Sequence, residues 1–164
     1  MKAIDTVRWV MRKADEWVSS GAGELRDAAL VQPTPRGGNH PLWIVGHLAL
    51  VEGMVPEVLF GEPNPVEHWK PLFDRGTTPT TDASAYPPYD EVLATYRDLQ
   101  AKNLARLEEI GEEGLDRPPA AIPPGFEKEM GTMGHTLLGI ALHQMSHVGQ
   151  LADARRASGL APRF

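Results

Sequence analysis

The spacing of apolar residues constrains the fold of this chain more than any other feature of the sequence. In four segments, apolar side chains recur every three or four residues, which is the period of one face of an α-helix. These segments cover about residues 4–18, 39–60, 89–110 and 132–158. No segment shows the alternation of apolar and polar residues that is typical of a half-buried strand. The sequence therefore predicts an all-α fold.

The expected helix ends carry residues that favour starting or stopping a helix. Asn39 is the expected N-cap of the second helix, with Pro41 in its first turn, and Thr132 is the expected N-cap of the fourth. Glycine favours the position just after a helix, because it readily adopts the left-handed conformation found there. The expected stops are Gly21 and Gly23 for the first helix, Gly61 for the second, Gly111 and Gly114 for the third, and Gly159 for the fourth.

Two long connections between the expected helices are rich in proline. Residues 62–88 contain six prolines, and residues 112–131 contain four. Loops of this length are uncommon in compact domains, where they often form lids or binding loops. A stiff crossover on the surface is the alternative, and the sequence leaves both interpretations open.

The length and composition of the chain predict one soluble domain over residues 1–164. A chain of 164 residues can form one hydrophobic core. Hydrophobic residues make up 41% of the chain and charged residues 23%, which is typical of globular proteins. The lack of cysteine excludes disulfides, thiolate metal sites and a cysteine nucleophile, and a cytoplasmic location is the simplest interpretation.

Charge and polarity predict neither a membrane segment nor a nucleic-acid partner. The most apolar stretch, residues 42–60, contains His47, Glu52 and Glu57, which a bilayer would penalise. Residues 1–10 lack the apolar core of a signal peptide. The net charge is −6, and no run of Lys or Arg forms the basic stripe that binding to phosphates requires.

Three of the six histidines occupy positions suited to binding a metal ion. His143 and His147 are four residues apart, so their rings lie about one turn apart on one face of the fourth helix. The same face carries Leu137, Ile140 and Leu151, which indicates that both rings point into the core. A buried imidazole needs a partner for each ring nitrogen, and a metal ion is one such partner.

His47 repeats this pattern among aliphatic residues of the second helix. For any one of these rings, the alternative is a core histidine bonded to a backbone carbonyl. Inward-facing histidines on two helices favour a shared site, as in proteins that build metal sites between facing helices. We therefore predict that His47, His143 and His147 bind one divalent metal ion. Imidazole ligands suit zinc, nickel, copper and iron, of which zinc or nickel is expected.

At these histidine motifs the sequence resembles the DinB-like, or YfiT-like, superfamily. Residues 38–48 (GNHPLWIVGHL) resemble its second helix, and residues 143–151 (HQMSHVGQL) resemble its fourth. The order of elements and the final Arg155-Arg156 followed by Gly159 match as well. The resemblance spans essentially the whole chain, and the two histidine motifs are its most specific part.

The resemblance implies an up-down four-helix bundle with a long crossover loop between helices 2 and 3, often as a homodimer. It implies that the metal ligands are one histidine of the second helix and two of the fourth, which correspond to His47, His143 and His147. Relatives include thiol-dependent transferases and isomerases, such as bacillithiol transferases and mycothiol-dependent maleylpyruvate isomerase, and others are described as metal-dependent hydrolases. A small-molecule substrate and a low-molecular-weight thiol are therefore expected.

Several function classes remain open at this stage. The chain could be a thiol-dependent S-transferase acting on a small electrophile, a hydrolase using metal-bound water, or a non-catalytic binding protein. A structural protein whose histidines bond to each other is a further alternative. The metalloprotease pattern needs Glu directly after the first histidine, whereas this chain has Gln144, which cannot act as a general base. The lack of an acidic residue beside the triad slightly favours thiol transfer, and no catalytic residue is assigned.

Other polar residues are secondary candidates. His40 is expected to be exposed at the start of the second helix, and His135 is expected to be structural. Gln150 could orient a ligand, although an ordinary interhelical hydrogen bond is the favoured role. Asn103 is a weak site candidate, because it is polar among apolar neighbours. Residues of the first long loop that could reach a substrate are His68, Trp69, Asp74, Arg75, Tyr86 and Tyr89.

Overall fold

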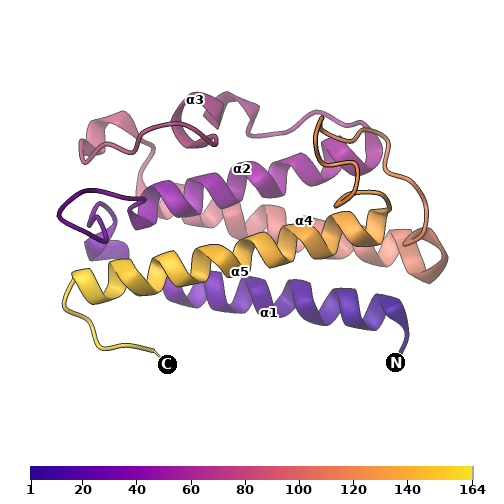
Figure 1. Ribbon diagram of the computed structural model, residues 1–164, viewed down its shortest axis with the longest axis horizontal. Coiled ribbons are helices and arrows are strands. Elements are labelled where there is room, and N and C mark those ends of the chain that lie inside the picture. Colours follow the sequence, from indigo (N-terminus) through magenta and orange to yellow (C-terminus); the bar gives the residue numbers. More distant parts are fainter. Residues whose placement is uncertain (164) are drawn as a thin grey trace.

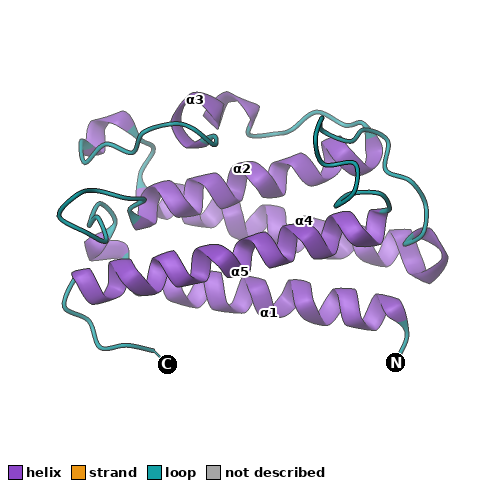
Figure 2. Cartoon of the chain, in the orientation of Figure 1, coloured by secondary structure: helices purple, strands orange, loops and turns teal. Residues whose placement is uncertain are grey.

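The computed structural model describes residues 1–163, and within this range the chain folds into helices and loops (Figure 1 and Figure 2). The α-helices are α1 (Ala3–Gly23), α2 (Pro41–Phe60), α3 (Lys70–Phe73), α4 (Tyr89–Gly114) and α5 (Met133–Ala157). The short 3₁₀-helices are η1 (Arg26–Ala28), η2 (Glu67–Trp69) and η3 (Ala83–Ala85). The only β-pairing among the described residues is an isolated bridge between Thr34 and Gly37. The predicted all-α class is confirmed.

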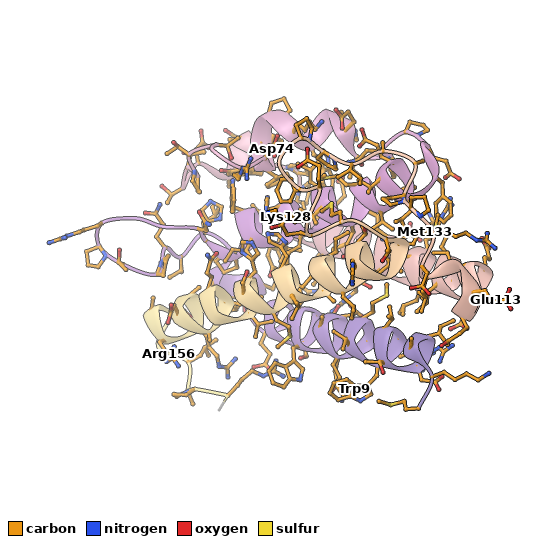
Figure 3. The ribbon with its side chains drawn as sticks, turned by 45° about the vertical axis from the view of Figure 1, so that its right-hand side comes forward. Trp9, Asp74, Glu113, Lys128, Met133 and Arg156 are labelled. Carbon is orange, nitrogen blue, oxygen red and sulfur yellow. The ribbon has the colours of Figure 1, made fainter. Side chains whose placement is uncertain are left out.

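The four long helices lie side by side. α1 packs against α4 and α5, and α2 packs against the same two helices. The short α3 lies over α2, on the side away from α1 (Figure 1). Met133 and Arg156 mark the two ends of α5 (Figure 3). Apolar side chains from all four long helices fill the interior in two clusters, one near each end of the molecule.

α2 is buried on nearly all of its faces. By length and composition alone it is a helix that could cross a bilayer, but 83% of its apolar window is buried inside the protein. A helix that is hydrophobic all round belongs either to a membrane or to a protein core. The packing of α2 against α4 and α5 makes it a core helix, in agreement with the prediction of a soluble protein.

One predicted helix end is wrong, and another is confirmed only in part. His40, and not Asn39, is the N-cap of α2, because its Nδ1 accepts a hydrogen bond from the backbone N–H of Trp43 at 3.1 Å. Of the two expected stops of α1, Gly21 lies inside the helix and Gly23 is its last residue. Glycine weakens a helix by only about 1 kcal/mol, and the packing of α1 against two neighbours outweighs this cost.

Other predicted ends agree with the structure. Thr132 caps α5 by accepting a hydrogen bond from the backbone N–H of His135 at 3.1 Å. Gly61 has a φ of 70° and ends α2, and Gly159 has a φ of 79° just beyond α5. Gly111 has a φ of 66° and kinks α4, which ends at Gly114.

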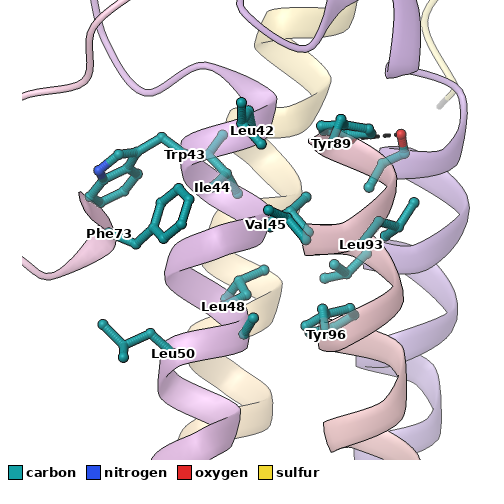
Figure 4. Packing of buried hydrophobic residues seen from close by; sticks show 14 of the residues in the cluster. Leu42, Trp43, Ile44, Val45, Leu48, Leu50, Phe73, Tyr89, Leu93 and Tyr96 are labelled. Atoms are coloured by element: carbon teal, nitrogen blue, oxygen red, sulfur yellow. Dashed lines mark hydrogen bonds between the residues drawn. The ribbon is translucent and has the colours of Figure 1, made fainter. Parts of the chain in front are cut away.

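The crossover between α2 and α4, residues 61–88, packs closely against α2. Phe73 is fully buried, and its ring lies against Gly46 next to Trp43 (Figure 4). A Cβ atom at position 46 would come within 2.4 Å of this ring, so the approach requires glycine. The crossover is thereby held against the helix that carries His47.

Two hydrogen bonds link the crossover to residues at the N-terminal end of α2. The indole Nε1 of Trp43 donates to Thr77 Oγ1 at 2.8 Å. His40 is fully buried, in contrast to its expected exposure, and its Nε2 donates to the carbonyl of Thr80 at 2.8 Å. These contacts make the first connection a fixed part of the structure around α2.

Candidate metal centre

The three predicted metal ligands lie together between α2 and α5. The Nε2 atom of His143 is 3.3 Å from that of His47 and 3.1 Å from that of His147. One ring nitrogen from each residue lies within 4.8 Å of the other two. His47 and His147 are only 8% and 7% exposed, and His143 is half-buried, so the cluster opens toward solvent at His143.

The local structure explains why the rings meet. His143 and His147 are one turn apart on α5, as their spacing predicts. His47 projects from α2 and stacks on Trp43, with ring centroids 4.9 Å apart and planes 6° from parallel. Trp43 is itself held by Thr77, so the crossover indirectly limits the freedom of the His47 ring.

Hydrogen bonds at the second nitrogen fix the tautomer of two rings. His47 Nδ1 donates to the backbone carbonyl of Phe73 at 2.8 Å. His147 Nδ1 donates to Gln150 Oε1 at 3.0 Å, and Asn39 donates to the same oxygen at 3.3 Å. Because both Nδ1 atoms carry the proton, the Nε2 atoms of these rings present lone pairs. This arrangement is typical of metal-binding histidines, whose other nitrogen bonds to a carbonyl or carboxylate.

These contacts fit a metal ion better than a cluster of histidines bonded only to each other. The Nε2 lone pairs of His47 and His147 both face His143 Nε2, which has at most one proton to share. His143 Nδ1 is buried and has no hydrogen-bond partner. A divalent ion at roughly 2.0–2.1 Å from each nitrogen would accept all three lone pairs, and a tetrahedral arrangement places the nitrogens about 3.3–3.4 Å apart.

The surroundings keep all three rings neutral. Burial, together with the proximity of His147 and His47, lowers the pKa of His143 to about 4. Burial likewise lowers the pKa of His47 and that of His147. Neutral imidazole is the form that binds metal, so the site disfavours the protonated form that would compete with an ion.

The histidine cluster contains no acidic ligand among the described residues. Asp74 follows Phe73 in the crossover, and its charge partly offsets the lowering of the pKa of His47. The neighbouring Arg75 lies over the ring of Phe126 at 5.9 Å, so the two long connections touch each other. Together with the fixed crossover, this contact gives the loops an ordered arrangement.

The secondary candidates divide into residues at the site and residues away from it. Gln150 contacts His147 directly, whereas the sequence favoured an ordinary interhelical hydrogen bond for it. His135 and His68 are exposed and lie outside the cluster. Asn103 is buried but bonds to Glu52, not to the triad.

Sequence reasoning missed two contributors near the site. The carbonyl of Phe73 orients His47, but a backbone group leaves no signal in a single sequence. Glu52 is buried within the apolar α2. A single carboxylate in such an apolar stretch indicates a hydrogen-bonded contact in the interior, and this could have been predicted from the sequence.

A family model described as the DinB superfamily matches residues 18–151 of the chain. This range contains all three histidines of the cluster. A search of curated proteins found no match to the chain.

Proposed function

The chain belongs to the DinB superfamily, and we propose that it is a metal-dependent enzyme with one divalent ion bound by His47, His143 and His147. The observation that carries the proposal is the convergence of the three Nε2 atoms, two of them on rings whose tautomer is fixed at Nδ1. Three protein ligands are also the number found in catalytic zinc sites, which keep one position open. Zinc or nickel is the expected ion, because both are bound well by imidazole.

We further propose that the reaction is the transfer of a low-molecular-weight thiol to a small electrophilic molecule. When bound, the ion would supply positive charge that favours thiolate over thiol. The chain has no cysteine, so the sulfur would come from the cosubstrate. Sulfur forms a bond to the electrophilic atom, the leaving group departs with its electron pair, and the proton of the thiol passes to solvent. The lack of a carboxylate in the histidine cluster, among the described residues, favours a thiol over water as the nucleophile.

The proposal includes a finer description of the fold and the assembly. A single domain over residues 1–164, built as an up-down four-helix bundle with a long crossover, is supported by the packing of α1 and α2 against both α4 and α5. A cytoplasmic homodimer without nucleic-acid or membrane partners is part of the same proposal. It is supported by the net charge of −6 and by the exposure of Trp9 (Figure 3) and Leu142, which are 62% and 65% accessible.

Metal analysis of protein purified without a metal-affinity tag tests the site. We expect about one equivalent of zinc or nickel per chain, and a large loss in the variant His143→Ala. His135→Ala is the matched control, because His135 lies on the same helix but is exposed and outside the cluster. Less than about 0.2 equivalents, even after zinc or nickel is added, would contradict the proposal.

A screen of electrophiles with and without low-molecular-weight thiols tests the reaction. We expect turnover that consumes thiol, disappears in His143→Ala and persists in His135→Ala. Turnover that does not require thiol would identify a hydrolase instead. A metal-loaded protein without turnover under either condition would be a binding protein.

A further inference from the structure

Glu52 is a buried carboxyl group behind the histidine cluster. It lies on α2, five residues beyond His47, and is only 1% exposed. Asn103 of α4 donates to its carboxylate at 2.7 Å, and Gln144 of α5 donates to the other oxygen. The same Asn103 nitrogen also donates to the backbone carbonyl of Glu52 at 3.0 Å. One side chain therefore joins three of the four long helices.

No cation pairs with Glu52 among the described residues, so its partners are neutral amides. Burial raises the pKa of Glu52 to about 7, against the effect of these two hydrogen bonds. The charge of Asp15 of α1 contributes to this raised pKa. The charge of Glu52 in turn raises the pKa of Tyr96 of α4. Gln144 Oε1 is buried and has no hydrogen-bond partner. A protonated Glu52 carries a hydrogen that its carboxylate form lacks.

The position of Gln144 links this contact to the metal ligands. Gln144 directly follows His143 in the rigid helix α5, and Glu52 lies on the helix that carries His47. A bond between Glu52 and Gln144 therefore sets the register of α5 against α2 close to where the two ligands must meet. Asn103 holds the same carboxyl from α4, so Glu52 cannot move without breaking two or more bonds.

We propose that Glu52 is a positioning residue for the metal centre, holding α5 through Gln144 so that His143 faces His47 at the distance a shared ion requires. This inference rests on the proposed metal site. Glu52 itself does not belong to the histidine cluster. It acts on the geometry of the site and not on the ion.

Titration of the metal-free protein with Co²⁺, followed by its visible absorption spectrum, tests the proposal. In Glu52→Leu we expect an altered spectrum and roughly tenfold weaker Co²⁺ binding, the lower end of the loss seen when residues behind metal ligands are removed. Glu52→Gln retains an oxygen acceptor and a nitrogen donor for Gln144, so it should restore the spectrum and the affinity. Leu59→Ala is the control for lost packing, because Leu59 is buried on the same helix but away from Gln144.

The outcomes separate this inference from the proposed function. Failure of the unchanged protein to bind Co²⁺ would overturn both. Co²⁺ binding that is the same in Glu52→Leu and the unchanged protein, or is equally weakened in Leu59→Ala, would overturn the positioning role alone. If Glu52→Leu does not fold, Gln144→Met removes the same bond from the α5 side and must show the same altered spectrum.

Discussion

The three histidines are alike in sequence context but differ in how their rings are held. His47 and His147 each donate from Nδ1 to an oxygen, whereas His143 Nδ1 has no partner. His143 is also the least buried of the three. Two rings are thus preorganised, whereas the orientation of the third would depend most on a bound ion and on the position of α5.

The hydrogen bond between His147 and Gln150 predicts that removing the Gln150 side-chain amide weakens metal binding. In Gln150→Leu, His147 Nδ1 loses its acceptor, so its tautomer and ring orientation are no longer fixed. We expect metal affinity to fall roughly 10–100-fold, the usual loss for such partners, with little change in helix content. Competition titration with a chelating dye measures the affinity. Equal affinity in the variant and the unchanged protein would show that Gln150 does not orient the ligand.

The raised pKa of Glu52 predicts that the free energy of unfolding depends on pH. Its pKa is about 7 in the folded protein and near 4.5 when unfolded, so the proton is bound more tightly in the folded state. The tighter binding of this proton stabilises the folded state fully below pH 4.5, and the stabilisation is lost as the pH rises through about 7. The total change in the free energy of unfolding is about 3 kcal/mol.

The measurement compares urea unfolding of the metal-free unchanged protein and Glu52→Gln across this pH range. The histidines oppose the trend, because their lowered pKa values cost stability as the pH falls below 6.5. Taking the difference between the two proteins cancels the histidine contribution. A difference in stability that does not change with pH would contradict the assignment of the raised pKa to Glu52.

At the scale of elements, the apolar period was enough to predict the four long helices, because each buries one or more faces against two neighbours. The identity of a cap was harder to predict. Asn39 is a better N-cap by type, but His40 fills that role because the crossover supplies Thr80 as a partner for its second nitrogen. Such a preference depends on a segment forty residues away and leaves no local signal.

Because the crossover lies so close to α2, adding a single methyl group at position 46 should destabilise the folded protein. In Gly46→Ala, the new Cβ would lie 2.4 Å from the ring of Phe73, so the crossover must shift. We expect a destabilisation of about 1–3 kcal/mol, as for other overpacked cores, measured by urea unfolding. Gly139→Ala is the matched control, because a Cβ there meets no atom within 4 Å and alanine favours a helix. A Gly46→Ala protein as stable as the control would mean that the crossover adapts freely.

At the scale of the whole molecule, the sequence located the histidines of the cluster but not what surrounds them. The spacing of His143 and His147 and the inward position of His47 bring the three rings to one place in the structure. The groups behind them come from other parts of the chain: a carbonyl of Phe73, and Glu52 bonded to α4 and α5. These contacts depend on how the helices and crossover pack, which the periodicity of single helices does not determine.

Because the cluster bridges α2 and α5, a bound ion would cross-link two core helices, and its binding free energy would stabilise the folded state. At a free ion concentration about 100-fold above Kd, the gain is about 2.7 kcal/mol. For a protein of this size, that corresponds to a rise in Tm of roughly 5–10 °C. Differential scanning fluorimetry with and without zinc or nickel, each reversed by a chelator, measures it. The rise should shrink at acidic pH, where protons compete for the three imidazoles. His143→Ala should lose most of it and His135→Ala none, and an equal rise in His143→Ala would place the ion elsewhere on the protein.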